Sequence, residues 1–247
     1  MDAKRLEKCQ DRLYSQPPLL GRWQRWRAVR SLMRDGSPEA VRLVAEGVVH
    51  SPDEATQSRA FEALRDLEDQ PAIDTVCSVW VALRHPRLSR LVFECDWVAS
   101  SPAPVRVLTA LRTKNLKVLT HGGSELIDSL VEACWETDSD LAGRARHCLL
   151  NLKSQKAIDA LCSRWLEKRE ELLSRALEEA NYLAHNPPFV RVVSALKLGR
   201  MEAVTSGGAD VAEPLIDACL DLDPKIAERA RFALGSLGQV EAQEAVC

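Results

Sequence analysis

Apolar side chains recur at helical spacing through most of the chain. In the segment 72–83, which reads AIDTVCSVWVAL, the positions i, i+3, i+4 and i+7 are held by Ile73, Val76, Cys77 and Trp80. This spacing places the four side chains on one face of an α-helix. No segment shows the alternation of apolar and polar residues that is typical of a half-buried strand. The pattern therefore predicts an all-α protein.

Prolines, glycine doublets and polar turns divide the pattern into separate helices. Proline cannot continue the interior of a helix, so the Pro17–Pro18 pair ends the first one. The predicted helices span residues 2–14, 19–33, 38–49, 53–67, 72–83, 88–99, 105–115, 124–136, 139–152, 156–168, 171–185, 189–200, 210–221 and 224–237.

The sequence repeats itself after 85 positions without gaps. Segments 71–111 and 156–196 share 18 identities over 41 positions, and 121–162 and 206–247 share 15. A fixed period is typical of proteins whose units stack into a solenoid. We expect residues 1–247 to form a single array of about three superunits, each made of two helix pairs and one additional helix. The expected boundaries are a cap helix in 1–15, then superunits 16–100, 101–185 and an incomplete 186–247.

An acidic turn followed by an arginine-bearing helix marks each superunit. The copies read DEATQSRAFEALRDL from Asp53, DSDLAGRARHCLLNL from Asp138 and DPKIAERARFALGSL from Asp223. The helix pairs 124–152 and 210–237, which contain the last two copies, resemble HEAT repeats of the short bacterial type found in phycobilisome lyase-like proteins. The resemblance implies a right-handed α-α superhelix, a HEAT-like solenoid, with a variant 85-residue unit.

The HEAT resemblance also implies a structural ladder between adjacent repeats. In that family an aspartate in the turn and a basic residue six positions later form hydrogen bonds from one repeat to the next. An aspartate at a helix N-terminus can accept backbone N–H bonds while it pairs with an arginine. The matching pairs are Asp53 with Arg59, Asp138 with Arg144, and Asp223 with Arg229.

The basic residues of the additional helix predict a candidate interaction stripe. Arg27, Arg112 and Lys197 are repeat equivalents, and equivalent positions in a stacked array project along one line. The candidate residues are Arg22, Arg25, Arg27, Arg106, Arg112, Arg191, Lys197 and Arg200. Such a stripe suits an acidic or phosphorylated protein segment, or a nucleic-acid backbone. Alternatively, these cations pair with acids on neighbouring helices.

The first copy of this helix, LGRWQRWRAVRSLMR, differs from the later ones in carrying two tryptophans. Trp23 stands where the later copies have Leu108 and Val193. Trp26 stands where they have Leu111 and Leu196, and all four aliphatic positions look buried. The pattern leaves the exposure of the two tryptophans open.

Composition narrows the classes of function. A net charge of −3 argues against a general nucleic-acid binder, and no apolar run reaches membrane-spanning length. The N-terminus is too polar for a signal peptide, so we expect a cytoplasmic protein without a membrane partner. The eight cysteines lie at helical spacing without a CxxC pair, which favours reduced, core-filling thiols. No nucleophile, metal or phosphate-loop motif is present, so we expect neither an enzyme nor a cofactor.

The leading hypothesis is a non-catalytic scaffold for protein–protein interaction, since HEAT arrays chiefly serve that role. The alternatives are a nucleic-acid-binding HEAT-like array, such as a base-repair enzyme with helical repeats, and a chromophore-lyase-like chaperone subunit. The final VEAQEAVC aligns with the start of a helix, so Cys247 falls inside one. We therefore expect the N-terminal sensing or docking module of a larger bacterial protein. Arrays with an RVLTALK-like helix resemble the repeat portions of such proteins, some of which carry WD-repeat propellers.

Overall fold

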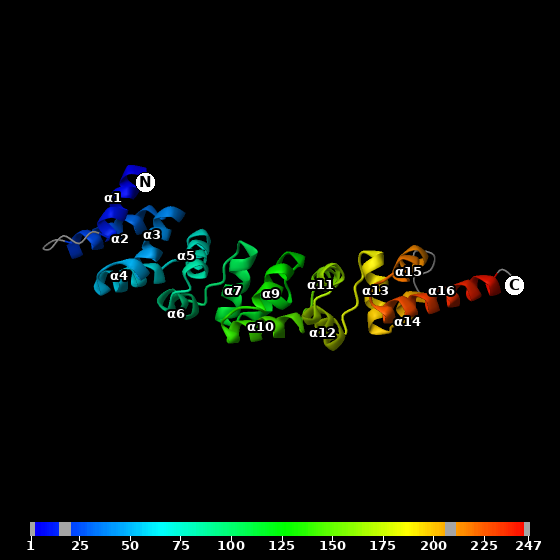
Figure 1. Cartoon of the computed structure of the whole chain (residues 1–247). Helices are drawn as coiled ribbons and strands as arrows, with labels where there is room; N and C mark the ends of the chain where they lie inside the picture. Colours follow the sequence, from blue (N-terminus) through cyan, green and yellow to red (C-terminus); the bar gives the residue numbers. More distant parts are fainter. Residues whose placement is uncertain (1–2, 15–20, 206–210, 245–247) are drawn as a thin grey trace. The chain divides into compact units, whose positions relative to one another are not determined.

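All regular structure in the described part of the chain is helical. The computed structural model describes residues 3–14, 21–205 and 211–244, and no strand occurs among them. The predicted all-α class is confirmed (Figure 1). The chain divides into two compact units: unit 1 comprises residues 1–116 and 136–141, and unit 2 comprises 117–135 and 142–247.

Unit 1 is a succession of helices in which each packs mainly on its neighbours in the chain. Its helices are α1 Ala3–Tyr14, α2 Gly21–Asp35, α3 Pro38–His50, α4 Glu54–Arg65, α5 Gln70–Leu83, α6 Pro86–Glu94 and α7 Ala103–Thr113. Helix α3 packs on both α4 and α5, and α4 in turn contacts α6. Figure 1 shows α3 and α5 on one side of the unit and α4 and α6 on the other. This neighbour-on-neighbour packing is how a helical solenoid is built.

Unit 2 repeats this succession. Its elements are η1 Ser124–Leu126, α9 Ile127–Ala133, α11 Gln155–Lys168, α12 Glu171–Ala180, α13 Pro188–Leu198, α14 Met201–Thr205, α15 Ala212–Ala218 and α16 Pro224–Glu244. Helix α8 (Leu116–Thr120) starts at the last residue of this stretch of unit 1, and α10 (Ser139–Leu149) contributes its first turn to unit 1. Helix α11 packs on η1, α9, α12 and α13, and α13 packs on α15 and α16.

Caps and buried leucines explain where the helices of unit 1 begin and how they pack. The side chains of Ser37, Asp53 and Asp69 accept hydrogen bonds from the first turns of α3, α4 and α5. Such caps satisfy backbone N–H groups that have no partner inside the helix. Helix α1 packs on α2 and α3, where it buries Leu13 completely.

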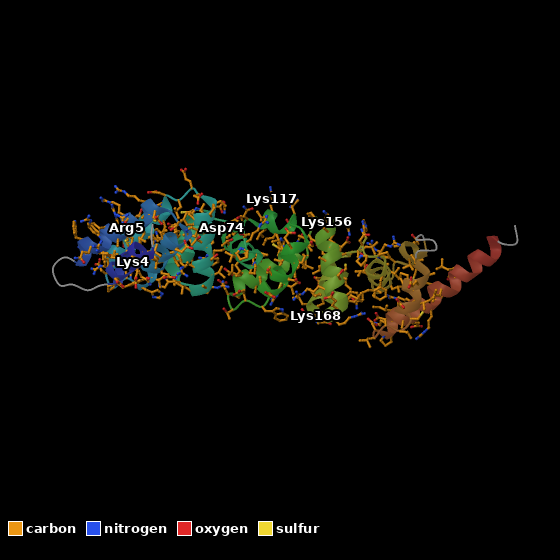
Figure 2. All side chains as sticks on the ribbon, turned by 90° about the horizontal axis from the view of Figure 1, so that it is seen from above. Lys4, Arg5, Asp74, Lys117, Lys156 and Lys168 are labelled. Atoms are coloured by element: carbon orange, nitrogen blue, oxygen red, sulfur yellow. The ribbon has the colours of Figure 1, made fainter. Side chains whose placement is uncertain are left out.

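Two predicted helices end earlier in the structure, because polar side chains hold the following loop. Helix α6 ends at Glu94 rather than 99, and the backbone N–H of Ser100 donates to Asp74 Oδ1 at 2.8 Å. Helix α12 ends at Ala180 rather than 185, and the N–H of His185 donates to Asp159 Oδ1 at 2.7 Å. Asp74 and Asp159 are repeat equivalents, so the device recurs in both units (Asp74 is labelled in Figure 2).

Other departures concern short helices and the last element. Helices α8 and α14, each a little over one turn long, follow the additional helices and were not expected. The helix predicted over 224–237 continues as α16 to Glu244. In the preceding copy of the repeat, the residues that correspond to this continuation leave the helix and are bound by other segments. Leu152 N–H donates to Tyr182 Oη at 2.6 Å, and Lys153 N–H donates to the Thr120 carbonyl at 2.7 Å.

Candidate interaction surface

The repeated ion pair at the end of the α5-type helix is a feature that the sequence pattern did not single out. Arg84 ends α5 and Arg169 ends α11, both with a left-handed backbone at φ 51° and φ 53°. Each backbone N–H donates at 2.7 Å to the carbonyl of a buried tryptophan, Trp80 or Trp165. Each guanidinium also lies over that indole, with the carbon 5.6 Å and 4.8 Å from the ring centre.

Both arginines pair with an acid 52 residues further along. Arg84 Nη2 lies 2.7 Å from Glu136 Oε1, and Arg169 Nη2 lies 2.5 Å from Asp221 Oδ2. A left-handed conformation costs an L-residue about 1–2 kcal/mol. Stacking and ion pairing offset this cost at the same place in each unit. The signal in the sequence was that arginine, tryptophan and acid all recur 85 residues apart.

The ladder predicted from the HEAT resemblance is built differently in unit 1. Asp53 pairs with Arg25 at 3.5 Å, and Arg25 Nε donates to the Thr56 hydroxyl at 3.3 Å. Arg59, the basic residue of the same motif, is exposed on α4 and takes part in no ion pair between described residues. In this part of the chain Asp53 thus pairs with α2, and Arg59 contributes no rung to a ladder. Arg25, 8% exposed, belongs to this buried pair and not to an exposed stripe.

In unit 2 the corresponding aspartate also pairs with the preceding additional helix. Lys197 Nζ lies 3.7 Å from Asp223 and 2.9 Å from Glu178. Arg229 caps the end of α13, where its Nη1 donates to the carbonyls of Leu196 at 2.5 Å and Lys197 at 2.9 Å. Lys197 is therefore neutralised rather than available to a partner. Arg229 binds carbonyls in place of the predicted aspartate.

The remaining residues of the predicted ladder and stripe differ from one another in burial and in contacts. Asp138 accepts the N–H groups of Asp140 and Leu141 at 3.0 and 3.3 Å, as an N-terminal cap. Half-buried side chains are those of Arg106, Arg112, Arg144 and Arg191. Arg200 is exposed. A uniform line of exposed cations therefore does not exist among the described residues.

Several of the exposed basic residues of unit 1 lie on α2. Arg22 and Arg27 are exposed, and so are the tryptophans between them, at 54% for Trp23 and 41% for Trp26. The guanidinium carbon of Arg27 lies 4.6 Å from the Trp23 ring centre, and that of Arg22 lies 5.2 Å from the Trp26 ring centre. These i,i+4 pairs make α2 a surface of arginines stacked on indoles.

A groove runs between α2 and α4. It encloses about 160 Å³ and is lined by Trp26, Val29, Arg30, Met33, Arg59 and Ala63. None of the ion pairs between described residues involves Arg22, Arg27, Arg30 or Arg59. We call the exposed side chains Arg22, Trp23, Trp26, Arg27, Arg30 and Arg59 the α2 surface. Behind it, the Arg25–Asp53 pair fixes α2 to α4.

The cysteines serve packing. Of the described cysteines, Cys9, Cys77, Cys134, Cys148 and Cys162 are buried, whereas Cys95 and Cys219 are partly exposed, so the core-filling prediction holds for the first five. Burial raises the pKa of Cys77, Cys134 and Cys162 to about 12, which keeps these thiols protonated at neutral pH. Cys247 lies outside the described residues.

The described residues offer neither a metal site nor a membrane span. They contain no cluster of three or more histidine, cysteine or acidic side chains that could hold a metal ion. None of their helices combines the length and apolarity needed to cross a bilayer. Compared with known proteins, the chain matches neither a family model nor a curated sequence.

Proposed function

We propose that the protein is a non-catalytic scaffold for protein–protein interaction and that its α2 surface binds an acidic segment of a protein partner. The observation that carries this proposal is that the exposed Arg27, Arg30 and Arg59 form no ion pair with a carboxylate among the described residues. In unit 2 the corresponding cation, Lys197, is neutralised by Glu178 and Asp223. A cationic face retained on a chain of net charge −3 attracts acidic segments.

The stacked arginines favour a protein segment over a nucleic acid. Single strands bind chiefly by stacking their bases on aromatic faces. On α2 one face of each indole already carries a guanidinium, that of Arg27 on Trp23 and that of Arg22 on Trp26. A guanidinium held flat on an indole still presents its N–H edge, which suits the two oxygens of a carboxylate.

Wider assignments form part of the same proposal. The acidic turns, the paired helices and the neighbour-on-neighbour packing support placing the chain among HEAT-like repeat proteins. We infer a cytoplasmic docking module of a larger bacterial protein. Rigid helical arrays suit such a role because they present side chains at fixed spacing.

The test is the binding of a fluorescently labelled glutamate-rich peptide to the purified chain, followed by fluorescence anisotropy. The double variant Arg27→Glu/Arg30→Glu should weaken binding by at least about tenfold, since charge-assisted contacts contribute about 1.5–3 kcal/mol each. The matched control is Lys156→Glu/Lys168→Glu, which changes the net charge equally on exposed positions of α11 (Figure 2). Circular dichroism checks that both variants stay folded.

Three results would contradict the proposal. The first is absence of peptide binding at low salt. The second is an equal loss of affinity in the two double variants, because binding would then follow net charge alone. The third is a single-stranded oligonucleotide that binds more tightly than the peptide and depends on Arg27 and Arg30, which would assign the α2 surface to nucleic acid.

A further inference from the structure

The groove between α2 and α4 differs in charge from the groove between α4 and α6 and from the groove between α10 and α12. Arg30 comes from α2 and Arg59 from α4, so one cation stands on each of the two helices that form the groove. Both side chains are exposed, and neither takes part in an ion pair with another described residue. The other lining residues, Trp26, Val29, Met33 and Ala63, carry no charge.

The next groove in unit 1, between α4 and α6, provides an internal comparison. It has a volume of about 260 Å³ and also contains two arginines, Arg87 and Arg90. Arg87 pairs with Glu54 at 3.0 Å and Arg90 with Glu94 at 2.6 Å. The carboxylate of Glu62 lines this groove as well. Its arginines are therefore neutralised, and an anion gains little there.

The corresponding groove of unit 2, between α10 and α12, follows the same rule. Arg175 pairs with Glu171 at 2.9 Å, and Arg146 donates to the Cys134 carbonyl at 3.0 Å. Glu179 adds a negative charge to its lining. Of the three grooves, only that between α2 and α4 holds two arginines and no acid.

Two unneutralised guanidinium groups match a phosphate monoester better than a carboxylate. A phosphorylated side chain carries a charge of about −1.5 to −2 and three acceptor oxygens at neutral pH. A carboxylate carries one charge and two oxygens, which one arginine can satisfy by itself. The apolar lining from Val29 and Met33 lowers the local dielectric constant, which strengthens the attraction between the arginines and a dianion.

We infer that the groove between α2 and α4 is a pocket for a phosphoserine or phosphothreonine side chain, bound between Arg30 and Arg59 with Trp26 along one wall. The inference rests on the proposed function, because the phosphorylated residue belongs to the acidic segment that the α2 surface binds. Phosphorylation of the partner would then strengthen an interaction that the acidic segment already makes.

The experiment compares two labelled peptides of the same glutamate-rich sequence, one with a central phosphoserine and one with serine. We expect the phosphopeptide to bind at least about tenfold more tightly, because the second arginine gains a charged partner. Inorganic phosphate should displace the phosphopeptide at concentrations at which chloride of equal ionic strength does not. Equal affinity for the two peptides would overturn the pocket but leave the acidic-segment proposal standing.

Variants locate the preference for phosphate. Arg30→Gln and Arg59→Gln should each lower the ratio of the two affinities towards one, and both sites are exposed, so folding is preserved. Arg27→Gln also removes one positive charge from α2, but Arg27 lies outside the groove. This variant should therefore lower the affinity for both peptides by a similar factor and leave the ratio of the two affinities unchanged. A ratio unchanged in Arg30→Gln and Arg59→Gln would place the phosphate elsewhere. Failure of both peptides to bind would refute the proposed function together with the pocket.

Discussion

Helix α2 of unit 1 and helix α13 of unit 2 occupy the same position in the repeat but differ in which of their side chains are buried. In α13 a continuous run is buried, from Val192 to Leu196, and the cation that follows it, Lys197, pairs with two acids. In α2 only one stripe is buried, and the positions equivalent to Val193 and Leu196 hold the exposed Trp23 and Trp26. A shared repeat position therefore does not determine a shared role.

The difference follows from the neighbours of each helix. Helix α13 packs against α11, α12, α14, α15 and α16, so almost every side of it is covered. Helix α2 packs against α1, α3 and α4, and the remaining side faces solvent. Arginine and tryptophan suit such a side, since both combine apolar surface with a polar edge. The neighbours of a helix, rather than its phase in the repeat, therefore decide whether its cation lies in an ion pair, as Lys197 does, or is exposed to solvent, as Arg27 is.

The largest contrast is expected at the position shared by Leu196 and Trp26. Leu196→Ala should lower the free energy of unfolding by about 3 kcal/mol, because it empties a fully buried site. Trp26→Ala should cost only about 1 kcal/mol, since the ring is already 41% exposed. Hydrogen–deuterium exchange measured separately in α13 and α2 distinguishes the two. A larger loss from Trp26→Ala would mean that α2 is a core helix like its counterpart.

The repeated arginine pairs should differ in strength between the units. Arg169→Ala should destabilise unit 2 by about 2 kcal/mol, because it leaves Asp221, with a side chain 4% exposed, without its cation. Arg84→Ala should cost about 1 kcal/mol or less, since the Glu136 side chain is 23% exposed and can be hydrated. Double-mutant cycles with Asp221→Asn and Glu136→Gln measure the two coupling energies. Equal couplings would show that burial of the acid does not control the pair.

A smaller contrast concerns the equivalent cations Lys197 and Arg27. Lys197→Ala should cost about 1 kcal/mol of stability, because its mostly buried ammonium group neutralises Glu178 and Asp223. Arg27→Ala should change stability by less than about 0.5 kcal/mol, as exposed substitutions usually do. Of the two substitutions, only Arg27→Ala should lower the affinity for the glutamate-rich peptide. If Lys197→Ala weakened binding of that peptide as strongly, exposure would not be what distinguishes the two cations.

Local patterns in the sequence predicted the helices well and their partners poorly. The helical period identified α5, and the 85-residue repeat identified α11 as its equivalent. Both depend on residues close in the chain. The ends of α6 and α12 depend on Asp74 and Asp159, which bind backbone 26 residues away. Local periodicity contains no information about such hydrogen bonds.

The same limit explains the outcome for the candidate site. Sequence reasoning found the basic character of α2, yet it placed Arg25 on the surface because five arginines in one helix look alike. Its burial depends on Asp53 and Thr56, which lie about 30 residues further along on α4. The groove residue Arg59 was assigned to a ladder because the family motif places a basic residue there. Which arginine meets an acid is decided by helix rotation, and an 85-residue period does not report it.

The smallest expected effect is the acid sensitivity of the pair that fixes α2 to α4. The Thr56 hydroxyl, which donates to Asp53 at 2.5 Å, and the charges of Arg25 and Arg22 hold the pKa of Asp53 below its ordinary value. A lowered pKa means that the folded state favours the carboxylate, so the stabilisation is present above the unfolded pKa of about 3.9. It is lost as the pH falls through the folded pKa. Asp53→Asn should therefore destabilise α4 at pH 7 and make a steadily smaller difference as the pH falls below about 4, measured by urea unfolding at a series of acidic pH values. A constant difference between the two proteins would show that packing at residue 53, rather than its charge, holds the two helices together.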